Sequence, residues 1–219
     1  MSVKKPNLYE DMEQVEDFSA VLANAREYEI DIKNCEITGV VSSGVDFSNI
    51  GFAGVVFRDC KFMGCDFSKA SFVDDAFSGC DLSNSVFEEA YFNRCEFTNC
   101  KGAGASFNST VIRDVSWTNC NFRYSIFNKA QFNNISIVYS DFCDAAFTES
   151  ALGGFSAENA YFLGTNFFRS PLKGVDFTKC EIEGIVLSDS NYELRGAVVT
   201  SLQAVSLSKF LGIVIKDEQ

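Results

Sequence analysis

The stretch CKFMGCDFSKASF, residues 60–72, places a phenylalanine at every fifth position and a small residue two places before each one. A strand that faces a core repeats its apolar residues every two positions, and a helix repeats them every 3.6 positions. A strict period of five therefore fits neither an ordinary strand nor an ordinary helix. It indicates an internal repeat, and such a repeat determines the architecture of the whole chain.

The repeat runs without an insertion from Ile32 to Leu187. Of the 32 positions at this spacing, nineteen are Phe, five are Ile, four are Leu and one is Trp117. Large apolar residues therefore occupy almost all of these 32 positions. The exceptions are Ser42, Gly102 and Ala157.

A second column of small residues lies two positions before the first, and it is interrupted only by Asp75 and Phe155. Eight of the nine cysteines fall in this column, which assigns the thiols to packing because buried Cys behaves as a small hydrophobe. We therefore expect no metal site, no disulfide and no cofactor. Asp75 requires hydrogen bonds or a local opening to offset its desolvation, and its role is left open between a structural irregularity and a function.

Two inward residues in every five make short extended segments that have to turn, so successive units wrap around one axis as a solenoid. If four units close one coil, residues 20 apart stack at the strand spacing of about 4.8 Å. Two core columns have this period. They are Phe47, Phe67, Phe87, Phe107, Phe127, Phe147 and Phe167, and Cys60, Cys80, Cys100 and Cys120.

This pattern resembles the pentapeptide-repeat proteins over residues 30–199. The resemblance implies an all-β fold, a right-handed quadrilateral β-helix of about eight coils, which we expect to be followed by a short C-terminal α-helix. A repeat of this kind identifies the fold far better than it identifies a function.

Both ends of a solenoid have to be covered. Residues 1–29 lack the period and are predicted to form an acidic arm and cap, with a helix over residues 17–28. In residues 200–219, Thr200 and Gln203 have the spacing of a capping box and Gly212 marks a helix stop. This helix and the strand after it form either the cap of a monomer or the interface of a homodimer. The expected interface residues are Leu202, Val205, Leu207, Phe210, Leu211, Ile213 and Val214.

The net charge of −12 argues against direct binding to nucleic acid or to an anionic membrane, because both require a basic surface. No signal peptide and no apolar stretch of membrane-spanning length is visible, so we expect a cytoplasmic protein.

No catalytic constellation is visible, and the chain contains no histidine, so a non-enzymatic binding protein is predicted. The outward carboxylates are scattered singly along the repeat. The candidate acidic surface for a basic partner consists of Glu36, Asp46, Asp59, Asp66, Glu88, Glu96, Glu149, Glu158 and Asp176.

The stretch LRGAVVTSLQAVSLSKFLGIVI, residues 194–215, is similar to the C-terminus of the quinolone-resistance (Qnr-like) branch of this family. The matching residues are Leu194, Gly196, Val199, Thr200, Gln203, Ala204, Leu207, Leu211, Gly212, Ile213 and Ile215.

The resemblance implies a homodimeric DNA mimic that binds the bacterial type II topoisomerases DNA gyrase and topoisomerase IV and protects them from quinolones, an antibiotic-resistance function. Several members of that branch have protective loops that break the register, whereas this repeat has none. The alternatives are an immunity protein that sequesters another toxin or antibiotic, and a structural scaffold without a topoisomerase partner.

Overall fold

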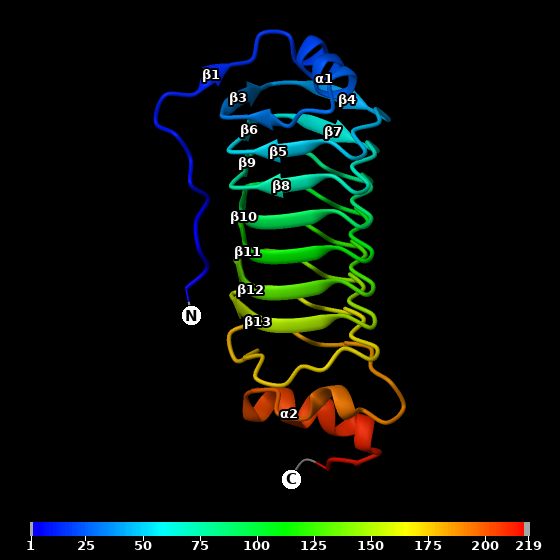
Figure 1. Ribbon diagram of the computed structural model, residues 1–219. Helices are drawn as coiled ribbons and strands as arrows, with labels where there is room; N and C mark the ends of the chain where they lie inside the picture. The colour runs from blue at the N-terminus through cyan, green and yellow to red at the C-terminus, as the bar shows by residue number, and fades with distance from the viewer. Residues whose placement is uncertain (1, 217–219) are drawn as a thin grey trace.

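Short strands stack in parallel along a single axis in the computed structural model, which describes residues 2–216 (Figure 1). Phe52 pairs with Ile32 in the coil before it and with Phe72 in the coil after it, so the spatial period is 20 residues. The predicted β-helix is confirmed, with about seven turns. Seven 20-residue steps lead from Ile32 to Leu172. From Leu187 to the next repeat position, Leu194, the step is seven residues instead of five, and this register slip interrupts the expected eighth coil.

Eleven strands form one sheet that bends around the solenoid, and two more form a small second sheet, within residues 2–216. In the early coils the sheet consists of separate short strands, whereas later coils merge two of them into one eight-residue strand around a corner. The elements are β1 (Glu13–Gln14), α1 (Phe18–Glu27), β2 (Ile32–Lys33), β3 (Cys35–Thr38), β4 (Val41–Ser43), β5 (Gly51–Ala53), β6 (Val56–Arg58), β7 (Lys61–Met63), β8 (Ser71–Val73), β9 (Ala76–Ser78), β10 (Tyr91–Thr98), β11 (Val111–Thr118), β12 (Gln131–Val138), β13 (Ala151–Glu158), the 3-10 helix η1 (Tyr192–Leu194), α2 (Ser201–Leu207) and the 3-10 helix η2 (Ser208–Leu211).

The corners explain why the period is five. Many residues at positions ending in 4 or 9 have a positive φ, for example Asn49 (60°), Arg94 (55°) and Gly104 (70°). A single left-handed residue turns the chain through a corner, and Asn, Asp and Gly adopt this conformation most readily. One such residue in each unit lets the following short strand begin on the next side.

Stacked phenylalanine rings fill the interior. In the Phe47 to Phe167 column the ring centroids of successive residues lie 4.7–5.4 Å apart, with the rings within 20° of parallel. The exception at Gly102 has a direct cause, since a Cβ atom there would lie 2.3 Å from the ring of Phe122. The ring of Phe122 thus fills the space that a side chain at residue 102 would occupy.

The small inward column also connects coils through hydrogen bonds. The hydroxyl of Ser140 lies 2.9 Å from the carbonyl of Val138 and 3.4 Å from that of Trp117 in the coil before, and it accepts from the amide of Cys120 at 3.0 Å. Cysteines repeat the contact with the coil before, as when the Cys100 thiol donates to the carbonyl of Phe77 at 3.4 Å. Most serines in this column bond both to the carbonyl 23 residues earlier and to the amide 20 residues earlier, whereas Thr110 and Ser125 donate to the carbonyl three residues earlier.

Helix α1 covers the N-terminal end of the stack (Figure 1). The side chain of Asp17 accepts from the amide of Ala20 and begins the helix, which lies inside the predicted segment 17–28. Its buried face includes Phe18, whose ring lies 5.8 Å from that of Phe47 in the first coil. Residue 1 and residues 217–219, at the extremes of the predicted arm and C-terminal segment, lie outside the described residues.

Candidate interaction surfaces

Helix α2 lies across the opposite end of the stack and is fastened there by one side chain (Figure 1). Thr200 and Gln203 form the predicted capping box. The side-chain amide of Gln203 also donates to the carbonyls of Phe177 and Cys180, at 2.9 and 2.8 Å. Gln203 thereby satisfies backbone groups that a further coil would otherwise pair.

The expected interface residues divide into two sets. Leu207 and Phe210 are half-buried and pack against the core of the solenoid. The others are uncovered in the single chain, with Leu202 and Val214 each 82% exposed. Exposed apolar side chains gathered at one end of a folded chain are typical of an interaction surface, and this set is here called the C-terminal apolar surface. Its members are Leu202, Val205, Leu211, Ile213, Val214 and Ile215.

A hollow of about 320 Å³ lies beside this surface, between the terminal coil and α2. Its lining includes Leu194, Val199, Ala204 and Leu211, so most of its wall is apolar. The helix therefore covers only part of the end of the stack. The C-terminal apolar surface continues into the hollow through Leu211.

Sequence reasoning missed two residues that hold this end together. Glu193 is fully buried, and its carboxylate accepts from the amides of Arg169 and Ser188 at 2.8 and 3.1 Å. Burial opposes ionisation of Glu193, but these hydrogen bonds bring its pKa below the usual value. Asn191, in a left-handed conformation, donates to the carbonyl of Phe210 at 2.9 Å. Asn191 and Glu193 both lie between Leu187 and Leu194, where the five-residue period is interrupted and no longer indicates which side chains point inward.

The nine candidate acidic residues lie on the outer surface, on two sides of the solenoid. Positions ten apart in a four-sided coil of 20 residues are on opposite sides, so the two sets face away from each other. One set contains Glu36, Asp59, Glu96, Glu158 and Asp176, and the other contains Asp46, Asp66, Glu88 and Glu149.

Several of these carboxylates already have basic partners. Ion pairs join Glu36 to Arg58 (3.0 Å), Glu149 to Arg169 (3.3 Å) and Glu158 to Lys179 (2.6 Å). Surface pairs contribute little to stability, but they reduce the negative potential that a basic partner meets. Asp176 instead accepts from the amide and hydroxyl of Thr178, and these hydrogen bonds lower its pKa. Glu96 and Asp176 occupy the same register position on one side, and neither forms an ion pair within residues 2–216.

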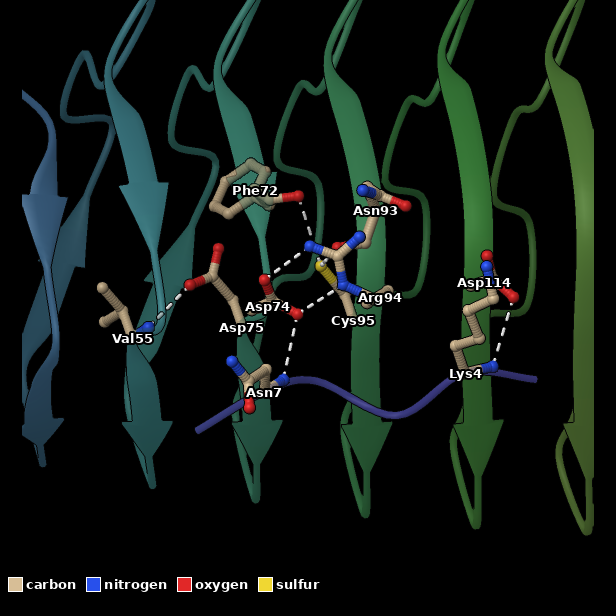
Figure 2. A network of polar contacts seen from close by, with 10 residues as sticks. All are labelled: Lys4, Asn7, Val55, Phe72, Asp74, Asp75, Asn93, Arg94, Cys95 and Asp114. Carbon is tan, nitrogen blue, oxygen red and sulfur yellow. Dashed lines mark hydrogen bonds and ion pairs between the residues drawn. The ribbon is translucent and has the colours of Figure 1, made fainter. Parts of the chain in front are cut away.

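Asp75 lies in the core and is fully buried, as its place in the column requires (Figure 2). One carboxyl oxygen accepts from the amide of Val55 at 2.7 Å, and the other, Oδ2, has no hydrogen-bond partner. Burial raises the pKa of Asp75 well above its usual value, despite this hydrogen bond. At this position of the column most Ser and Cys residues donate to the carbonyl 23 residues earlier, which for Asp75 is the carbonyl of Phe52. Only the neutral acid has a proton for such a carbonyl.

All nine cysteines are unpaired and buried. Burial raises the pKa of Cys35 to about 11, so this thiol stays protonated at neutral pH. Across residues 2–216, no group of three or more His, Cys, Asp or Glu side chains is arranged to hold a metal ion. None of the helices within the described part of the chain is long and apolar enough to cross a membrane.

Two family models match the repeat. Residues 43–74 match the model described as pentapeptide repeats (8 copies), and residues 70–147 match the model described as pentapeptide repeat region. Residues 43–147 of the chain therefore consist of pentapeptide repeats. A comparison with curated proteins found no match.

Solved structures of several repeat proteins are similar to this chain. Full-length QnrB1, described as a plasmid-mediated fluoroquinolone resistance protein, is 24% identical, with 81% of this chain and 90% of that chain covered and a TM-score of 0.44. HetL from the cyanobacterium Nostoc sp. strain PCC 7120, described as involved in heterocyst differentiation regulation, is 14% identical, with 85% and 98% covered and a TM-score of 0.28. A repeat protein from the Arabidopsis thaliana thylakoid lumen is 26% identical, with 44% and 68% covered and a TM-score of 0.29.

Proposed function

We propose that this chain is a non-enzymatic homodimer that binds a bacterial type II topoisomerase in place of DNA and protects it from quinolones. The observation that carries the proposal is the C-terminal segment with the Qnr-like pattern. Its Gln203 fastens α2 to the last coil, and Leu202, Val205 and Leu211 remain uncovered. A second copy is the occupant that this uncovered surface fits, because an isologous contact would bury the same apolar residues on both chains.

The dimensions and charge of such a dimer support binding in a DNA groove. Seven turns at a strand spacing of about 4.8 Å give a rod of about 34 Å, and a dimer joined through α2 would be about twice as long. The chain carries a net charge of −12, and its candidate acidic surface forms two strips along opposite sides. Basic grooves that bind duplex DNA attract such a rod by the same electrostatics.

The proposed dimer gives the first prediction. Replacing Leu202 and Val214 with aspartate places two charges in the apolar surface, and we expect the mass measured by light scattering to fall from two chains to one. Phe210 is less suitable for this test because it packs against the core of its own chain. Val41→Asp is the control, since Val41 is 68% exposed near the other end of the stack. A native mass of one chain would contradict the dimer.

Charge reversal gives the second prediction. The double variant Glu96→Lys with Asp176→Lys reverses two acidic residues on one side, and we expect on the order of tenfold more protein to be needed for protection of gyrase. The control is Glu181→Lys with Glu183→Lys, which makes the same change in net charge at exposed positions on a side that carries none of the nine candidate residues. Lys101 and Arg123 occupy the same two register positions in earlier coils, so basic residues at these positions are compatible with the fold. Equal losses in both variants would show that net charge alone is responsible.

The decisive assay is DNA supercoiling by gyrase with and without ciprofloxacin, over a titration of the purified chain. Restored supercoiling in the presence of the drug would support the proposed function. No effect at any concentration, together with a pull-down that recovers no topoisomerase subunit, would favour sequestration of another molecule or a scaffold role.

A further inference from the structure

The N-terminal segment of residues 2–8, here called the arm, does not extend into solvent but runs down the side of the stack (Figure 1). It leaves the end of the solenoid at β1, which pairs with β3 in the first coil. The backbone amide of Asn7 then donates to Asp74 at 2.9 Å, and that of Lys4 donates to Asp114 at 3.2 Å (Figure 2). The carbonyl of Ser2 accepts from the side chain of Asn134 at 3.2 Å. The arm thus crosses several coils that are remote from it in sequence.

The side chains that receive the arm form one row, here called the corner ladder, of Asp74, Arg94, Asp114 and Asn134. They are spaced 20 residues apart at the same corner, with φ values of 60°, 55°, 50° and 62°. Arg94 donates twice to the carboxylate of Asp74, at 2.6 Å from each of two guanidinium nitrogens, and Asn134 donates to Asp114. These contacts orient both carboxylates before any ligand arrives, which lowers the ordering cost of binding.

The ladder matches the repeat distance of an extended peptide. Each coil of the stack, 20 residues long, is here called a rung. Asp74 and Asp114 lie two rungs apart, which is about 9.6 Å at a strand spacing of about 4.8 Å. Lys4 and Asn7 are three residues apart, which is about 10 Å in an extended chain. Two amides at positions i and i+3 therefore meet two carboxylates on alternate rungs without strain in either partner.

The charge of the peptide, rather than its hydrogen bonds, selects the class of ligand. The hydrogen bonds use the backbone of the arm, and Val3, Pro6 and Leu8 are half-buried while Lys4 and Lys5 remain exposed. The arm carries two lysines and no acid, in a chain of net charge −12. A cationic segment beside two carboxylates is favoured by the field of the whole protein as well as by the direct bonds.

We propose that the corner ladder is a binding site for an extended, lysine-bearing peptide and that residues 2–8 are its resident ligand. The site is separate from the C-terminal apolar surface and does not depend on topoisomerase binding. Release of the arm exposes two oriented carboxylates and a strip of corner backbone, which then accept a peptide of the same chemistry from another molecule.

Amide hydrogen exchange on the full chain tests the resident ligand. In the native protein we expect the Lys4 and Asn7 amides to exchange slowly, and in Asp74→Gly with Asp114→Gly to exchange at least about tenfold faster. Glycine is native to this corner, where Gly54, Gly154 and Gly174 occupy the same register position. The control is Asp59→Gly with Asp144→Gly, which makes the same replacement at two other left-handed corners. Unprotected Lys4 and Asn7 amides in the native protein would overturn the proposal.

A labelled peptide with the sequence SVKKPNLYE, residues 2–10, tests binding from a second molecule. The full chain with Lys4→Pro and Asn7→Pro lacks both amide donors, so its arm should release the ladder and the peptide should bind saturably in fluorescence anisotropy. The native chain should bind at least about tenfold less, because its own arm is held at a high effective concentration. The control Lys5→Pro with Tyr9→Pro keeps both donors and should behave like the native chain. No saturable binding at millimolar peptide, or equal binding by all three chains, would overturn the proposal.

Discussion

A chain with Asp75→Val is expected to be more stable than the native chain at pH 7, by about 1–3 kcal/mol, and this advantage should shrink as the pH is lowered to 4. Asp75 is fully buried with one carboxyl oxygen unpaired. Val55, one rung before Asp75, and Val115, two rungs after it, are buried at the same position of the coil, so valine fits there. The variant gives up the hydrogen bond from the Val55 amide, which offsets part of the gain.

The direction of the pH dependence follows from the raised pKa of Asp75, whose main cause is burial. Between the usual pKa and the raised value, the folded chain keeps a proton that the unfolded chain has lost. Stability therefore falls as the pH rises through this window, by up to about 1.4 kcal/mol per pH unit, and is fully present below it. At pH 4 the two chains should differ only through packing and the lost hydrogen bond.

Urea unfolding of both chains from pH 4 to pH 8 measures the effect. The control Asp46→Val changes an exposed aspartate whose pKa is lowered, chiefly by hydrogen bonds from Ser48, so it should not reproduce the slope. Parallel pH profiles for the native chain and Asp75→Val would show that Asp75 is ionised in the folded protein.

Removing one ring from the centre of the core should have the largest destabilising effect. For Phe107→Ala we expect a loss of about 3–5 kcal/mol in the free energy of unfolding. The Phe107 ring stacks on Phe87 at 4.7 Å and on Phe127 at 4.8 Å, so its loss leaves a cavity between two coils. Because each coil contacts only its neighbours, the two halves should also unfold less cooperatively, with a smaller denaturant m-value.

Guanidinium unfolding of Phe107→Ala should be compared with Tyr161→Ala. Tyr161 is 49% exposed, and its truncation should cost about 1 kcal/mol or less. Similar losses for the two variants would mean that the ring column does not carry the coupling between coils.

The sequence predicts the repeating part of this fold well because each position is specified many times. The period places Phe107 inward and stacks it on Phe87 without knowledge of any distance, and the same column places Asp75 in the core. The capping box of Thr200 and Gln203 was also predicted, since its signal is local. The second role of Gln203, as a donor to two carbonyls of the last coil, depends on where α2 lies and has no local signature.

The arm shows why the remaining features could not be predicted. Its contacts join Lys4 to Asp114 and Ser2 to Asn134, across more than one hundred residues, and each uses a backbone group that every residue possesses. The burial of Glu193 was missed for a related reason, because the five-residue period ends at Leu187 and its register no longer applies. The sequence does contain one further signal. The many Asn, Asp and Gly residues at positions ending in 4 and 9 mark the left-handed corners, including the corner of the ladder.

The unbroken register of the coils has a consequence for any partner that recognises the sides of the rod. Displacing the solenoid by one rung, about 4.8 Å, superimposes its backbone on itself, so backbone shape alone would permit several nearly equivalent bound positions. A unique complex requires features that lack this translational symmetry. The ion pair of Asp74 with Arg94, the arm and the two capped ends are such features. Contacts with these features would fix a single bound position of the partner along the axis of the solenoid.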